Sequence, residues 1–167
     1  LLLYGDKADF EIITLAGLTK IYGLNYDGLM GAYYGDTIKM QNVETIMFAD
    51  QTITVETSSI GGNYKHWGST SGTTIDGTDG NDVIDSGGGS DKINGKTGDD
   101  TLLLYGDKAD FEIITLAGLT KIYGLNSDGL MGAYYGDTIK MQNVGTVMFA
   151  DQTITLETSS IGGNYKH

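Results

Sequence analysis

The chain contains no cysteine, no proline and no arginine among its 167 residues, and these absences narrow what it can be. Without cysteine there are no disulfides, no thiol catalysis and no thiolate metal ligands. The ten positive side chains are all lysines, and 22 Asp plus Glu residues bring the net charge to −12. Such a surplus of carboxylates repels a phosphate backbone, which excludes nucleic acid as a partner. No apolar run approaches the roughly 20 residues of a membrane span.

A long internal repeat organises the chain. Residues 1–66 (copy 1) recur as residues 102–167 (copy 2) with an offset of 101 residues. The copies differ at four positions: Tyr26/Ser127, Glu44/Gly145, Ile46/Val147 and Val55/Leu156. Two sequences this similar are expected to fold alike, and a fixed period of this length is typical of a tandem array. We therefore expect a piece of a longer array, with an engineered duplication as the alternative.

The segment between the copies has a period of nine residues. It reads GTDGNDVID (77–85), SGGGSDKIN (86–94) and GKTGDDTLL (95–103). Position six is always aspartate (Asp82, Asp91, Asp100), and position eight is always aliphatic (Ile84, Ile93, Leu102). The preceding nonapeptide, 68–76, keeps Ile75 in phase but has Thr73 in place of the aspartate, so it is interpreted as a degenerate first turn.

This pattern predicts stacked turns that need a cation. Glycine-rich hexapeptides permit tight reversals, and the three residues that follow are long enough for a short strand. Stacking places the aliphatic side chains in one ladder and the aspartates in another, and a column of carboxylates repels itself unless it is neutralised. Calcium prefers oxygen ligands, and no histidine or thiolate lies in this block. A flexible acidic linker is the alternative, but it would not require in-phase aliphatic residues.

These nonapeptides resemble the hemolysin-type, or RTX, calcium-binding repeat G-G-x-G-x-D-x-U-x. The sequence departs from it at Ser86 (position one) and at Thr78 and Lys96 (position two). The resemblance implies a parallel β-roll that binds one to three calcium ions between turns on the same side. The implied ligands are the three position-six carboxylates and turn carbonyls, with these further candidates: Thr78, Asp79, Gly80, Gly87, Gly89, Lys96 and Gly98.

The resemblance also implies how the carboxylates pair. Alternate repeats face the same side, so Asp82 pairs with Asp100 in the best site. Asp91 then needs a partner from the degenerate turn or from Asp107 or Asp110. The loss of Asp79 is expected to matter less than the loss of Asp82 or Asp100.

The duplicated segment favours short antiparallel strands. Alternating β-branched and aromatic residues predict strands at 10–15, 19–24, 37–40, 43–48 and 52–55, separated by Gly, Asn and Asp turns. The sequence therefore predicts an all-β chain in three regions: a meander at 1–66, the roll at 67–103 and a second meander at 104–167. The strings ADF and NVETIMFADQTI resemble the segment that follows nonapeptide blocks in large secreted RTX proteins and adhesins. The Tyr33–Tyr34 pair and its copy, Tyr134–Tyr135, are expected either to complete the β core or to form a sugar-stacking surface.

The candidates for catalysis are few. The two histidines, His66 and His167, occupy equivalent positions, and neither HExxH nor GxSxG occurs. We therefore expect a calcium-stabilised, non-enzymatic module of a long secreted or cell-surface RTX-type protein, exported by type I secretion, whose neighbours in an array or filament are copies of itself. Chelation is expected to unfold the nonapeptide block before the meanders. The alternatives are a polysaccharide-binding array and a calcium-binding appendage of a secreted hydrolase or epimerase.

Overall fold

The computed structural model describes the chain except for residues 26–32, 58–60, 68, 128–131 and 158–167, and it leaves the side chains of 64–67 undescribed. Its described elements are β-strands, together with short 3-10 turns such as η1 (Lys7–Asp9) and η3 (Lys108–Asp110). The all-β expectation is therefore confirmed. Within the described residues, no helix is long and apolar enough to cross a bilayer.

The nonapeptide strands alternate between two sheets. Strands β8 and β10 are parallel neighbours in one sheet, to which β6 from the end of copy 1 adds in parallel, and β7 and β9 are parallel neighbours in the other. Partners on the nonapeptide strands lie 18 residues apart, as Val83 pairs with Thr101 and Thr74 with Lys92. This arrangement is a parallel β-roll, formed by β6 (Asn63–Trp67), β7 (Thr74–Asp76), β8 (Asp82–Asp85), β9 (Lys92–Asn94) and β10 (Thr101–Leu103).

Copy 2 continues both sheets of the roll. Strand β13 pairs in parallel with β9, and β14 pairs in parallel with β10. The hairpin β11–β12 then extends the first of these sheets in antiparallel fashion, and β15 extends the second. The strands are β11 (Phe111–Leu116), β12 (Leu119–Gly124), β13 (Thr138–Gln142), β14 (Thr146–Met148) and β15 (Thr153–Thr155). Hydrogen bonds thus cross the predicted boundary at 103/104, although the three-region division itself stays a prediction.

The aliphatic residues at position eight form the predicted ladder. In one sheet Ile84, Leu102 and Val147 are cross-strand neighbours and are fully buried. In the facing sheet Ile75, Ile93 and Met141 align in the same way. Both rows belong to one apolar cluster between the sheets, so the roll and copy 2 share a single core.

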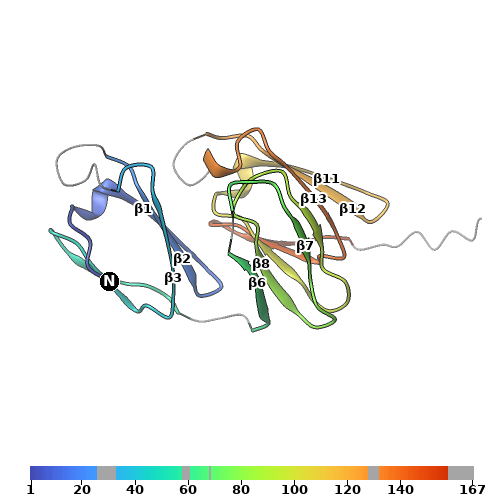
Figure 1. Cartoon of the computed structure of the whole chain (residues 1–167), viewed down its shortest axis with the longest axis horizontal. Helices are drawn as coiled ribbons and strands as arrows, with labels where there is room; N and C mark the ends of the chain where they lie inside the picture. The colour runs from blue at the N-terminus through green and yellow to red at the C-terminus, as the bar shows by residue number, and fades with distance from the viewer. Residues whose placement is uncertain (26–32, 58–60, 68, 128–131, 158–167) are drawn as a thin grey trace, which may run out of the picture.

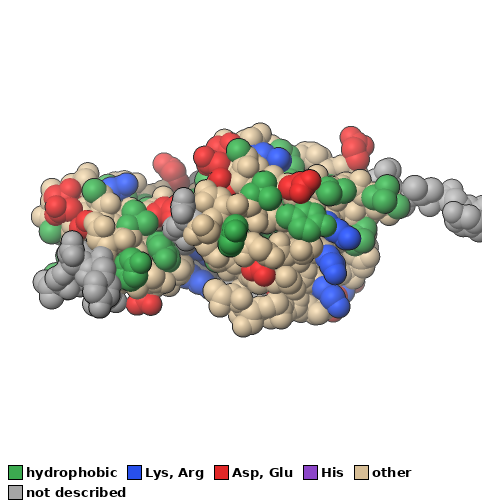
Figure 2. Space-filling view, turned by 90° about the horizontal axis from the view of Figure 1, so that it is seen from above, with side chains coloured by type: hydrophobic (Ala, Val, Ile, Leu, Met, Phe, Trp, Pro, Cys, Tyr) green, Lys and Arg blue, Asp and Glu red, His purple; other side chains and the backbone are tan. Residues whose placement is uncertain are grey.

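Copy 1 repeats the local structure of copy 2 without nonapeptide strands beside it. Strands β1, β2 and β3 form an antiparallel sheet, β4 pairs with β5, and Leu2 bridges to Met47. The strands are β1 (Phe10–Leu15), β2 (Leu18–Gly23), β3 (Thr37–Gln41), β4 (Thr45–Met47) and β5 (Thr52–Thr54). A separate small cluster around Phe10, Ile21 and Phe48 forms its core. Figure 1 shows copy 1 beside the roll, and Figure 2 shows the two parts as adjoining lobes.

The first hairpin of each copy closes with a two-residue turn. Ala16 and Gly17, between β1 and β2, have φ of 51° and 79°. Ala117 and Gly118 of copy 2 have φ of 53° and 79°. Positive φ at both central residues is typical of a type I′ turn, whose twist matches that of the strands. The turn therefore fixes the register in which Leu15 pairs with Leu18.

Candidate calcium-binding turns

Turns two repeats apart stack on one another, as the nine-residue period predicts. Gly98, with φ of 116°, lies so close to Gly80 that a Cβ atom on it would come within 2.7 Å of the Gly80 carbonyl. Hydrogen bonds join the same two turns, because Asp99 donates its amide to Asn81 Oδ1 and Thr97 donates its hydroxyl to the Asp79 carbonyl. The turns that precede β8 and β10 therefore form one column. Those that precede β7 and β9 form the other.

The first column brings Asp82 and Asp100 together. The Asp82 amide donates to Asp100 Oδ1 at 2.9 Å. Thr78 donates its amide to one carboxylate oxygen of Asp82 and its hydroxyl to the other. Both aspartates are buried, with exposed fractions of 1% and 0%. The pair that was expected to form the best site is thus assembled by the fold, although its assignment as ligands stays a prediction.

This pair carries negative charge that the described residues do not balance. Neither Asp82 nor Asp100 forms an ion pair with any described lysine, and Asp100 Oδ2 is buried without a hydrogen-bond partner. Burial raises the pKa of Asp100 above its ordinary value of 3.8, the Asp82 amide opposes that shift, and the charges of Asp82 and Asp99 add to it. An uncompensated buried carboxylate is costly, and a hard cation is the natural counter-ion for it. The donor set therefore fits calcium.

The second column holds Asp91 against the degenerate turn. Thr73 donates its amide and its hydroxyl to Asp91 Oδ1, at 2.8 and 3.0 Å. Thr73 is the position-six residue of that turn, so Asp91 does meet the degenerate turn, but through a hydroxyl and an amide in place of a second carboxylate. A cation on this side would need further oxygens.

Copy 2 supplies a carboxylate on this side that the sequence analysis missed. Asp137 accepts a hydrogen bond from the Gly89 amide at 2.9 Å and one from the Ser90 hydroxyl at 3.2 Å. Asp137 is followed by Thr138 and the buried Ile139, a D-x-aliphatic string like that of the nonapeptides. That string was the sequence signal that could have identified Asp137. It lies outside the nine-residue frame, and Asp137 reaches the turn that contains Gly89 only because β13 pairs with β9.

The structure engages Asp107 and Asp110 in a different role. Asp107 donates its amide to Asp110 Oδ2, and Asn126 donates to Asp110 Oδ1, so the two aspartates cap the η3 turn. Asp6 and Asp9 cap η1 in the same way. These carboxylates shape the turn that leads into β11, and the expectation that Asp107 or Asp110 completes the Asp91 site stays a prediction.

Backbone carbonyls must supply most of any coordination shell. In the described part of the chain, no three acidic or histidine side chains gather closely enough to hold a metal ion by themselves. The turns do present carbonyls beside the aspartates: Gly89 accepts the Asp91 amide, and Gly80 accepts the Thr78 hydroxyl. Gly87 and Lys96 have similar backbones, with φ of 76° and 71°. Asp79 and Asp99 are exposed at the outer rim of the turns.

The tyrosine pairs divide between core and surface. Tyr134 is 2% exposed and packs edge-on against Phe111, and Tyr33 packs in the same way against Phe10. The second members, Tyr34 and Tyr135, are 54% and 60% exposed. A sugar-stacking surface could therefore not use the buried Tyr134, whereas Tyr33 is half-buried and Tyr34 and Tyr135 are exposed, so the expectation of such a surface stays a prediction for these three residues.

Comparison with known families agrees with this geometry. Residues 67–102, a range that includes the degenerate turn, match the family model described as the RTX calcium-binding nonapeptide repeat (4 copies). A search of the curated proteins found no match. The segment 67–102 is thus an RTX-type calcium-binding repeat block, a module typical of secreted proteins.

Proposed function

We propose that this chain is a calcium-stabilised structural module of a long secreted or cell-surface protein, such as an adhesin, an extracellular fibre or a surface-layer component, and that it has no catalytic role. The observation that carries the proposal is the buried pair Asp82 and Asp100, whose negative charge no described lysine balances. A protein that places two carboxylates there needs a cation to stay folded. That requirement makes folding a response to calcium concentration.

The dependence of folding on calcium follows from the residues of the roll. Without a cation, repulsion between Asp82 and Asp100 and the cost of burying them oppose the stacking of the turns. Calcium bound there would supply the positive charge that offsets both terms. The carboxylates of Asp82 and Asp100 and the carbonyls of the glycine turns would hold it, and the stacked turns would favour the pairing of β8, β10 and β14. Binding free energy becomes folding free energy, so a chain exported unfolded through a low-calcium compartment folds outside.

The duplication supports a structural role in preference to catalysis. Two copies that match at 62 of 66 positions have the same internal strand pairings, and each provides an antiparallel hairpin, the strand that extends it and a second short strand pair. Repetition of one unit suits a function that depends on length, such as spanning a distance from a surface.

The test is a calcium titration from a chelated state, followed by circular dichroism and by the fluorescence of Trp67, whose strand β6 pairs with β8. We expect a saturable gain of β signal with calcium and none with magnesium. Asp100→Asn should raise the calcium midpoint about tenfold or more, because it removes a charged oxygen from the site. The matched control is Asp99→Asn, which changes the same charge at an exposed neighbour. Equal effects of the two variants would contradict the proposed site.

A second candidate function rests on the exposed tyrosines. Tyr34 and Tyr135 occupy equivalent places on the two copies, which would give an array regularly spaced aromatic rings. Aromatic rings stack on the apolar faces of sugars, so such an array could bind a surface polysaccharide. Glycan binding that is lost in Tyr34→Ala/Tyr135→Ala and retained in Tyr4→Ala, which changes another exposed tyrosine, would support this function. Retention in both variants would refute it.

A further inference from the structure

The first hairpin of copy 1 is buried against the roll. We define the hairpin tip as residues 15–18 in copy 1 and residues 116–119 in copy 2. Leu15 and Leu18 are 5% and 1% exposed, and both belong to the apolar cluster that also contains the core residues of the roll. The tip of copy 1 is therefore packed against the roll, although it lies more than 60 residues before β8 in the sequence.

A buried ion pair anchors this contact. Lys20 Nζ lies 2.8 Å from Asp85 Oδ1, and the two side chains are 4% and 0% exposed. The same ammonium lies 4.0 Å from the centroid of the Tyr105 ring, and the Tyr105 hydroxyl donates to the Leu18 carbonyl at 3.4 Å. Asp85 ends β8 and Tyr105 follows β10, so β2 docks against the ends of two neighbouring strands of one sheet. Removal of either charge would leave its partner buried and uncompensated.

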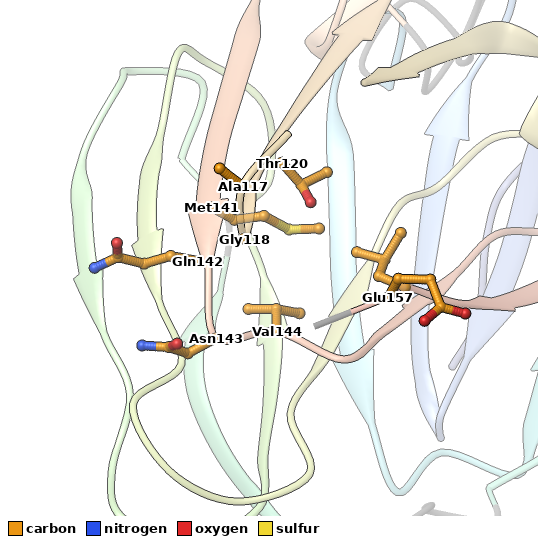
Figure 3. Close-up of a pocket in the computed structure, with 9 residues that line it drawn as sticks. Ala117, Gly118, Thr120, Met141, Gln142, Asn143, Val144 and Glu157 are labelled. Carbon is orange, nitrogen blue, oxygen red and sulfur yellow. The ribbon is translucent and has the colours of Figure 1, made fainter. Parts of the chain in front are cut away.

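The identical tip of copy 2 is exposed. Leu116 is 76% exposed and Leu119 is 43% exposed, and nearby Ile114 on β11 is 48% exposed. Lys121, the equivalent of Lys20, is half-buried. A pocket of about 220 Å³ lies beside the tip, and Figure 3 shows Ala117 and Thr120 on one side of it, with Val144 and Glu157 on another. Copy 2 thus exposes an apolar hairpin tip, and Lys121 follows this tip on β12.

We propose that the hairpin tip of copy 2 is a docking surface for the nonapeptide roll of another unit of this same sequence, at the face formed by Asp85 and Tyr105. The four positions at which the copies differ include no residue of the tip and no lysine, so copy 2 presents the side chains that copy 1 uses. The contact seen within this chain therefore serves as the template for the next one. The inference rests on the proposed function only in that the receiving roll must be folded.

Charge and shape select a roll as the occupant. Lys121 lies beside Lys140 across the sheet, and Lys140 lies beside Lys92, so three like charges line one face. An occupant that brings a buried carboxylate relieves this repulsion, as Asp85 does for Lys20. The receiving face also requires nonapeptide strands. In copy 1 the equivalent of Tyr105 is Tyr4, and none of the described nonapeptide strands lies beside it. Tyr4 is 59% exposed, whereas Tyr105, which follows the nonapeptide strand β10, is fully buried.

The experiment extends the chain by one unit, repeating residues 67–167 after His167 so that the 101-residue spacing is kept. In the added unit, the position equivalent to Ser127 carries threonine. Copy 1 has Tyr26 at this position and copy 2 has Ser127, so the peptides that contain the three hairpins differ in mass. Lysine acetylation rates are measured by mass spectrometry in saturating calcium. In the 167-residue chain Lys20 should react at least about tenfold more slowly than Lys121, because only Lys20 is buried. In the extended chain Lys121 should slow to the rate of Lys20.

Hydrogen exchange of the tip amides provides a second readout. Amides of residues 116–119 should gain protection only in the extended chain. Leu116→Glu in that chain should restore rapid acetylation of Lys121 while leaving the β signal unchanged, because Leu116 is exposed in the shorter chain. A Lys121 that reacts equally fast in both chains while circular dichroism shows folded rolls would overturn the docking proposal. A chain that folds without any change of β signal on addition of calcium would refute the proposed function instead. The acetylation rates of Lys121 in the two folded chains would still decide whether the tip docks.

Discussion

Lys96 is a lysine in a backbone conformation that suits glycine. Its φ is 71°, close to the 76° of Gly87 at the same position of the preceding repeat. A side chain with a Cβ atom in this left-handed region is strained by roughly 1–2 kcal/mol. The strain is local to one turn of the candidate calcium site, where the carbonyl of Lys96 is one of the expected ligands.

Lys96→Gly should therefore stabilise the calcium-loaded chain by about 0.5–1 kcal/mol, since relief of strain exceeds the extra entropy of an unfolded glycine. Urea unfolding in saturating calcium measures the change. Lys92→Gly is the matched control, because Lys92 is also exposed but lies in strand β9, where glycine should destabilise by a similar amount. A destabilising Lys96→Gly would contradict the account of strain.

The carboxylates of Asp50 and Asp151 hold equivalent loops in place. Each accepts a backbone amide hydrogen bond at 2.8 Å, from Lys7 and Lys108 respectively. These bonds lower the pKa of both carboxyls below the ordinary value of 3.8. A carboxyl whose pKa falls on folding stabilises the fold above the unfolded pKa, and this contribution is lost as the pH falls through the folded pKa.

The stability difference between the parent chain and Asp151→Asn should accordingly be constant from pH 7 to about pH 5 and shrink below pH 4. Thermal unfolding across this pH range, at fixed calcium, measures it. Asp107→Asn provides a control in the same loop. A difference that persists unchanged at pH 3 would show that the Lys108 amide does not favour the ionised carboxyl.

At the residue scale, the nine-residue period was sufficient to place Asp82 next to Asp100 and to put Ile84, Ile93 and Leu102 inside. It was not sufficient for Asp137. That residue reaches the second column only because β13 adds to β9, and a pairing between strands almost 50 residues apart leaves no periodic mark in the sequence. The ion pair of Lys20 with Asp85 is hidden for the same reason, since it joins residues 65 positions apart.

At the level of elements, the two first hairpins form a natural pair for comparison. They have the same sequence, the same type I′ turn and the same strand register, yet one tip is buried and the other exposed. Sequence patterning predicted both hairpins, because alternation and turn residues are local signals. It could not predict their different surroundings, because burial depends on whether a roll lies against the tip.

Leu15→Ala should cost about 2–4 kcal/mol of stability, as for a leucine that leaves a cavity in a packed core. Leu116→Ala should stay within about 0.5 kcal/mol, because the side chain is 76% exposed. Denaturant unfolding of the calcium-loaded chain compares the two directly. Equal losses would show that the tip of copy 1 does not dock on the roll in solution.

On the scale of the whole molecule, the nonapeptide block and copy 2 belong to one core, whereas copy 1, apart from its hairpin tip, has a core of its own. The nine-residue frame ends at Leu103, but the sheets do not, because β13 and β14 take the places of two further turns. We therefore expect chelation to unfold copy 2 together with the nonapeptide block, and not after it.

Chelation should remove amide protection from β8, β9, β10, β13 and β14 together, while β1, β2 and β3 of copy 1 keep theirs longer. The reason is that the strands of copy 2 lose their parallel partners when the turns separate, whereas copy 1 retains its antiparallel sheet. Hydrogen exchange at a series of calcium concentrations measures the order. Simultaneous loss in all three regions would indicate one cooperative unit.

The buried contact between Lys20 and Asp85 also has a mechanical consequence. A pulling force applied along the chain meets two connections between copy 1 and the roll, the covalent backbone and this docked hairpin. Separating copy 1 from the roll requires the buried charged pair to be parted, which costs more than breaking an exposed ion pair. A chain in which each such contact is formed would resist bending between neighbouring units. Under a pulling force, its units would separate one at a time.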